Sequence, residues 1–143
     1  MTDPGPRPRR HMGLMALLGF LSMTALGGGA ALFIRPDGGL LGMGTGQLAT
    51  NVFPDFRWPG VILFSVFGIG SAMALILLVR RSAIAGRSAM AVGAAQVVWI
   101  IVQVVMIKDP SVLQAVFLTV GIVITALAAR ANGSRNGTDG RTA

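Results

Sequence analysis

The sequence predicts an all-α protein, an integral membrane antiparallel four-helix bundle. Hydrophobic residues make up 53% of the 143 positions and charged residues 12%, whereas a soluble domain carries about 25% charged residues. Four segments contain no Asp, Glu, Lys, Arg or His: Met12–Ile34, Pro59–Val79, Ser88–Ile107 and Pro110–Ala129. Each has about 20 residues, enough for a helix to cross a hydrocarbon core of roughly 30 Å. None shows the polar face that a core helix of a soluble protein needs.

The chain is therefore divided into one transmembrane domain, residues 12–130, and two tails. Its helices are expected at about 12–34, 59–79, 88–107 and 110–129. Residues 1–11 and 131–143 are polar, basic and without periodicity, so both tails are predicted to be disordered. A cleavable signal peptide would also begin with a basic region and an apolar run. The run from Met12 is long for a signal, and a bundle of four needs it, so we expect this helix to be retained.

The longest loop, Arg35–Trp58, opens with a turn-forming composition at Arg35–Gly39 and permits a short helical turn at Gly46–Phe53. Its aromatic residues are expected to anchor the loop at the membrane interface: Phe53, Phe56 and Trp58. One interpretation is a cap over the outer mouth of the bundle, because long loops often carry function. The favoured interpretation is an amphipathic connector that lies on the membrane.

The second helix starts with Pro59, whose missing N–H suits the first helical position. Ser65, Gly68 and Ala72 recur at three-to-four spacing and predict one small-residue face for a neighbouring helix. The third helix carries a stripe whose steps of four, three, four and three keep it on one face: Ala89, Gly93, Gln96, Ile100 and Gln103.

Three glutamines and a tryptophan are the candidate ligand-binding residues: Gln96, Trp99, Gln103 and Gln114. Gln114 follows the tight loop 108–111, where Asp109 is expected to cap the fourth helix and Pro110 to lie in its first turn. Gln103 and Gln114 then lie at matching depth and are able to form a hydrogen bond. The favoured interpretation is helix–helix hydrogen bonding, worth about 0.6 kcal/mol per bond. The sharper alternative is a small outward-facing polar pocket with the Trp99 ring as one wall.

The distribution of charge predicts the orientation. The two tails and the middle loop hold nine basic and two acidic residues, and the other two loops hold three of each. Since loops rich in Lys and Arg stay in the cytoplasm, both termini are predicted to be cytoplasmic, in the cytoplasmic (inner) membrane. The residues expected to set topology and contact lipid headgroups are Arg7, Arg9, Arg10, Arg80, Arg81, Arg87 and Arg130. This role accounts for the net charge of +7 without nucleic-acid binding.

Several kinds of chemistry lack the residues they require. The chain has no cysteine, one histidine and no glutamate, so no metal site, cofactor or catalytic residue is predicted. Proton- and ion-coupled transporters usually carry an ionisable group inside the membrane, and the four apolar segments contain none. Arginine outnumbers lysine eleven to one, which suggests a GC-rich bacterial genome.

The span from His11 to Arg130 resembles a family of small bacterial four-helix membrane proteins without an assigned activity. The resemblance rests on Pro36-Asp37-Gly38 with Leu41-Gly42, on Asp55-Phe56 with Pro59-Gly60, and on Trp99, Gln103 and Gln114. In helix number and length the chain is also similar to the DoxX-like membrane proteins. Both resemblances imply the four-helix fold and supply no catalytic residues.

The function expected first is that of a non-enzymatic packing or accessory component of the membrane. Its partners would be the lipid bilayer and either a second copy of the chain or another membrane protein. The alternative is a binder or transporter of a small neutral or lipid-like molecule through the Gln/Trp pocket.

Overall fold

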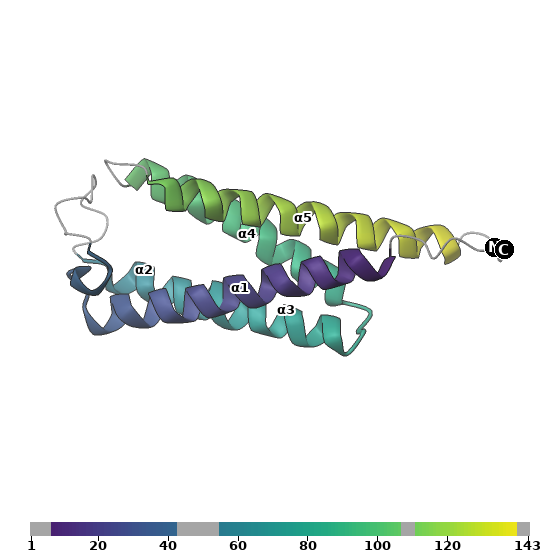
Figure 1. Cartoon of the computed structure of the whole chain (residues 1–143), viewed down its shortest axis with the longest axis horizontal. Helices are drawn as coiled ribbons and strands as arrows, with labels where there is room; N and C mark the ends of the chain where they lie inside the picture. Colours follow the sequence, from purple (N-terminus) through teal and green to yellow (C-terminus); the bar gives the residue numbers. More distant parts are fainter. Residues whose placement is uncertain (1–6, 43–54, 107–110, 140–143) are drawn as a thin grey trace.

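The computed structural model describes residues 7–42, 55–106 and 111–139, and it is an antiparallel bundle of four long helices (Figure 1). The first is α1 (Arg7–Ile34), followed by the short 3-10 turn η1 (Gly39–Leu41). The second consists of α2 (Arg57–Ile62), the π-helical segment η3 (Leu63–Ile69) and α3 (Gly70–Val79) in direct succession. The last two are α4 (Ala85–Met106) and α5 (Val112–Asp139). The predicted all-α four-helix fold is confirmed.

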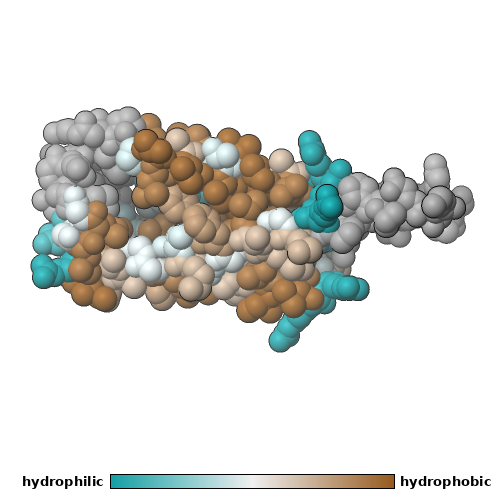
Figure 2. All heavy atoms as spheres, in the orientation of Figure 1, coloured by the Kyte–Doolittle hydropathy of each residue, from teal (hydrophilic) through white to brown (hydrophobic). Residues whose placement is uncertain are grey.

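All four helices are long and apolar enough to cross a membrane, over Arg9–Ile34, Arg57–Val79, Ala85–Val105 and Val112–Gly133. Large apolar side chains such as Met23 and Val105 are mostly exposed on the outside of the bundle. Figure 2 shows this apolar surface as a band between two hydrophilic ends. An apolar outer surface of this kind is compatible with the hydrocarbon core of a membrane. The chain therefore has the structure of a multi-pass membrane protein.

The helices extend beyond the apolar segments that predicted them. Residues 7–11 and 131–139 are helical, where the sequence predicted disordered tails. Backbone hydrogen bonding continues past the edge of an apolar segment, because polar residues can occupy the turns outside the lipid. Asn132 also packs directly against Gly86 of α4, which holds the first residues after Arg130 against the bundle. The predicted turn at 46–53 and cap at Asp109 lie outside the described residues.

Glycines bring the helices together in two close pairs. A Cβ atom on Gly29 of α1 would lie 2.6 Å from the Phe64 backbone nitrogen, and one on Gly60 would lie 2.8 Å from Leu32 Cβ. In the second pair, a Cβ atom on Gly93 of α4 would lie 2.8 Å from the Thr125 nitrogen of α5. Small residues at these crossings allow backbone-to-backbone contact, as is typical of membrane helices.

The predicted small-residue face of the second helix is only partly correct. Gly68 is buried against α1, where its carbonyl oxygen accepts a hydrogen bond of 2.9 Å from the Ser22 hydroxyl. Ser65 instead points outward and its hydroxyl donates to the Val61 carbonyl oxygen. The reason is η3: a π-helix bonds residue i to i+5 rather than i+4. The wider turn of η3 therefore places Ser65 on a different side of the helix from the one that a regular three-to-four spacing predicts.

One predicted interfacial anchor is also wrong. Phe56 is 3% exposed, and its backbone N–H donates to the Pro36 carbonyl oxygen at 2.9 Å. It thus closes the two ends of the loop against each other instead of facing the membrane interface. Trp58 is exposed, as an interfacial anchor would be, and Phe53 lies outside the described residues.

The hydrophobic core occupies one end of the bundle, which we call the core end. It contains residues from α1, from α3, from the start of α4 and from the middle of α5: Leu14, Leu18, Leu21, Ala74, Leu78, Ala85, Ala89, Ile124 and Ala128. Toward the opposite end, which holds η1 and is called the loop end, the α4–α5 pair diverges from the α1–α2 pair (Figure 1). The space between the two pairs is the candidate site.

Candidate functional site

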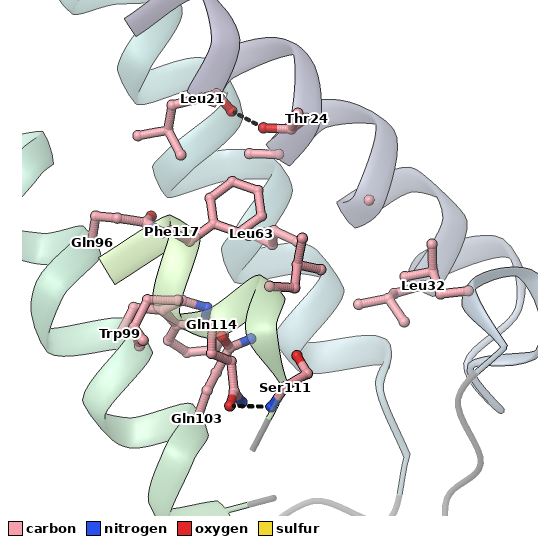
Figure 3. A pocket seen from close by; sticks show the side chains of 15 residues that line it. Leu21, Thr24, Leu32, Leu63, Gln96, Trp99, Gln103, Ser111, Gln114 and Phe117 are labelled. Atoms are coloured by element: carbon pink, nitrogen blue, oxygen red, sulfur yellow. Dashed lines mark hydrogen bonds between the residues drawn. The ribbon is translucent and has the colours of Figure 1, made fainter. Parts of the chain in front are cut away.

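A cavity of about 370 Å³ lies between the two helix pairs, beside the core and toward the loop end (Figure 3). Its walls come from α1, η1, η3, α4, α5 and the residue before α5. The lining residues are Leu21, Thr24, Ala25, Gly28, Leu32, Leu41, Leu63, Gln96, Trp99, Ile100, Gln103, Ser111, Leu113, Gln114 and Phe117. All four residues that the sequence singled out as candidate ligand-binding residues line this one cavity.

Two aromatic contacts join the helix pairs around the cavity. The Phe20 ring of α1 stacks on the Phe117 ring of α5, with centroids 6.1 Å apart and planes at 19°. The Phe67 ring of η3 packs against the Trp99 ring of α4, with centroids 6.0 Å apart and planes at 39°. Rings in such arrangements gain stability beyond their buried area. These contacts hold the two pairs together while leaving the space between them.

The predicted stripe on the third helix is confirmed as the inward face of α4. Ala89, Gln96 and Ile100 are 0%, 1% and 3% exposed. Gly93 is buried against α5, and Gln103 is half-buried. The stripe therefore changes along the helix from small residues in the core to amide side chains in the cavity wall.

Gln96 lies where the core meets the cavity. A Cβ atom on Gly121 of α5 would lie 3.0 Å from Gln96 Cγ, so the stem of the glutamine packs directly on the backbone of α5. Its Oε1 atom is buried and has no hydrogen-bond partner in the part of the chain that the structure describes. A buried acceptor without a partner costs about 1–3 kcal/mol, so this atom calls for an explanation.

Trp99 presents a second polar atom of this kind. Its Nε1 atom is buried and likewise finds no acceptor among the described residues. Gln96 and Trp99 are three positions apart on α4, so their side chains are neighbours on one side of the helix. Both residues line the cavity, whereas these two polar atoms are themselves buried within the protein.

Gln114 has a local structural partner. It is 8% exposed, and its Oε1 atom accepts a hydrogen bond of 3.2 Å from the backbone N–H of Ser111. Ser111 directly precedes α5, so this bond is half of a capping box, in which the third helical residue reaches back to the N-cap. The interhelical bond predicted between Gln103 and Gln114 is not formed, because the Gln114 oxygen binds Ser111 and no bond joins the two described side chains.

The facing wall, contributed by α1 and η3, was not predicted. It is apolar at Leu21, Ala25 and Leu63, and the Thr24 hydroxyl already donates to the Phe20 carbonyl oxygen at 2.8 Å. In the sequence, these residues look like any others in an apolar helix, so no local signal marked them. Leu41 of η1 also lines the cavity, which places the start of the Arg35–Trp58 loop at its wall. Residues 43–54 of that loop lie outside the described part.

No Asp, Glu, Lys, Arg or His is among the described residues that line the cavity. The basic side chains predicted to contact lipid headgroups are exposed where the structure describes them: Arg9, Arg10, Arg80, Arg81, Arg87 and Arg130. They gather at the core end, on the right in Figure 2, away from the cavity. Arg7 begins α1 at the same end. The described residues that line the cavity therefore supply apolar surface and amide side chains, but no charge.

No protein-family model, curated protein or solved structure matches the chain. The resemblances to small bacterial four-helix membrane proteins and to DoxX-like proteins stay predictions.

Proposed function

We propose that this protein is a non-enzymatic membrane protein that binds a small neutral or lipid-like molecule in the cavity between its helix pairs. The observation that carries the proposal is the cavity of about 370 Å³, whose lining brings together the four candidate residues Gln96, Trp99, Gln103 and Gln114.

The size and composition of the cavity support the same proposal. Its volume of about 370 Å³ falls in the range of about 300–1,000 Å³ that is typical of small-molecule sites. It is also more than twice the roughly 150 Å³ of an apolar cavity that holds benzene. Apolar walls with a few convergent polar groups are the usual composition of such sites. The packed core closes the other half of the bundle, which favours binding over transport.

The competing function is that of a packing or accessory component, with the glutamines as interhelical hydrogen bonds. Gln96 and Gln103 form no side-chain hydrogen bond to another described residue, and the Gln114 bond lies within its own helix end. The contacts between helices are instead made by glycines and by Ser22. These observations favour binding.

Two neighbouring glycines provide a matched test. Gly28 lines the cavity, whereas Gly27 is exposed on the outside of α1 with nothing within 4 Å of a Cβ atom. Native mass spectrometry from membrane nanodiscs should show an extra mass on the wild type and on Gly27→Leu. Gly28→Leu, which fills the cavity, should lose it. A bare protein in all three samples, or an extra mass that Gly28→Leu retains, would refute the proposal. The same spectra give the oligomeric state, including any second copy of the chain.

We further propose the cytoplasmic membrane as the location, with the core end facing the cytoplasm. The support is the cluster of arginines at that end, since positively charged segments stay on the cytoplasmic side. The cavity then opens toward the opposite side of the membrane. Reporter fusions at both termini should report cytoplasmic ends, and an external C-terminus would contradict this orientation.

A further inference from the structure

The cavity between the helix pairs is elongated along the bundle axis. Its lining follows α1 from Leu21 to Leu32, which is about 16 Å along a helix, and α4 from Gln96 to Gln103, about 10 Å. The α1 part lies within a membrane-spanning segment, so the long axis of the cavity is parallel to the surrounding lipid chains. A length of about 16 Å is also close to half of the roughly 30 Å hydrocarbon core, which is the thickness of one leaflet.

The deep end of the cavity, where it meets the core, presents almost no polar surface. Gln96 as a whole is 1% exposed, and the Trp99 Nε1 atom is buried within the protein. The Thr24 hydroxyl donates to the carbonyl oxygens of Phe20 and Leu21 in its own helix, at 2.8 and 3.1 Å. A polar ligand group placed here would lose its hydrogen bonds to water without gaining others, which is costly.

Polar groups are accessible at the opposite end. Gln103 is half-buried and Ser111 is exposed, and both lie with Gln114 at the loop end of the cavity (Figure 3). Two apolar residues that line the same end, Leu41 and Leu113, are 45% and 63% exposed. The cavity therefore reaches the surface of the bundle at its loop end.

We propose that the cavity holds an acyl chain of a membrane lipid. The methyl end of the chain lies at the deep end near Phe117, and the polar head group stays outside the loop end beside Gln103. This inference rests on the proposed function and deepens it by naming the class of ligand and its direction in the site. A hydrocarbon chain needs no hydrogen bond from the deep end and gains from burial in its apolar walls.

Other kinds of ligand fit the cavity less well. A compact polar molecule would find few accessible polar atoms at the deep end, and a buried charge would find no counter-charge among the described lining residues. A peptide helix, about 10–12 Å across with its side chains, is too wide. The helix pairs are joined around the cavity by the Phe20–Phe117 and Phe67–Trp99 ring contacts, whose centroids are 6.1 and 6.0 Å apart.

The test uses two photoreactive phosphatidylcholines in nanodiscs. One carries a diazirine at the methyl end of an acyl chain, and the other carries it beside the ester. Illumination attaches the probe to nearby residues, which are identified by mass spectrometry of peptides. Val98 and Val105, exposed at 60% and 72% on the outside of α4, report labelling by lipid that merely surrounds the protein.

The methyl-end probe should label Phe117 more than Gln103, and the ester-end probe should show the opposite preference. Gly28→Leu fills the cavity, so labelling at Phe117 by the methyl-end probe should fall about tenfold while labelling at Val98 is unchanged. Gly27→Leu, on the outside of α1, should keep the wild-type pattern. The two probes on the wild type decide the question even where Gly28→Leu fails to fold.

Failure of this inference is distinguishable from failure of the proposed function. Labelling confined to outward positions such as Val98, the same pattern with both probes, or labelling at Phe117 that persists in Gly28→Leu would overturn the acyl-chain site. If native spectra then still show an extra mass that Gly28→Leu loses, a different ligand occupies the cavity and the proposed function stands. Absence of both the extra mass and the inward labelling would overturn both.

Discussion

Replacing Gln96 by methionine should stabilise the protein in the absence of added ligand. The substitution removes Oε1, a buried acceptor with no partner among the described residues. Methionine is unbranched, so it keeps the Cβ and Cγ atoms that pack on Gly121. Leucine would branch at Cγ, where that contact is tightest.

The expected gain is about 1 kcal/mol in the free energy of unfolding, or about fivefold in the equilibrium constant. An unpaired buried acceptor costs about 1–3 kcal/mol. We take the lower end because polar contacts of membrane helices contribute modest free energies, about 0.6 kcal/mol per hydrogen bond on average. If Gln96 instead joined helices through a hydrogen bond, the substitution would lower stability by about 0.6 kcal/mol. The two interpretations therefore predict changes of opposite sign in the free energy of unfolding.

Steric trapping in bicelles measures this free energy without removing the protein from a bilayer-like environment. The control is Gln103→Met, the same chemical change at a half-buried position of the same stripe, which should stay within about 0.5 kcal/mol of the wild type. A loss of stability in Gln96→Met, with Gln103→Met unchanged, would refute the argument that Gln96 lacks a partner.

Two further substitutions, at Gly93 and Gln114, test a helix contact and a helix cap in the same assay, and Gly27→Ala is the control for Gly93→Ala. Gly93→Ala should lower the free energy of unfolding by about 2 kcal/mol, because its Cβ atom would meet the Thr125 backbone nitrogen at 2.8 Å. A Cβ atom on Gly27 meets nothing within 4 Å, so Gly27→Ala should leave the free energy of unfolding unchanged or raise it by up to about 1 kcal/mol. Equal effects of the two substitutions would contradict the close contact between α4 and α5 at Gly93. Gln114→Met should lower the free energy of unfolding by about 1 kcal/mol, through loss of the bond to the Ser111 N–H. Unchanged or higher stability of Gln114→Met would contradict a stabilising role for this cap.

Periodicity explains why the α4 side of the cavity was predictable. Gln96 and Gln103 stand out because amides are rare in apolar helices, and their spacing places them on one face with Ala89 and Ile100. That face is inward in the structure, as the burial of Gln96 shows. A regular α-helix preserves such a face from end to end. The second helix does not, because η3 interrupts the regular spacing and turns Ser65 outward.

By itself, the sequence determined the membrane class, the four helices and the polar side of the site. Long segments without charge can satisfy their backbone in lipid only as helices. Only the tertiary structure decided that the helices close as two glycine-bound pairs, and that the pairs meet at the core end and leave a cavity toward the loop end. It also decided that Gln114 caps its own helix and that Gln96 and Trp99 lack partners among the described residues. These outcomes depend on distances between segments far apart in the chain, which composition and local spacing do not specify.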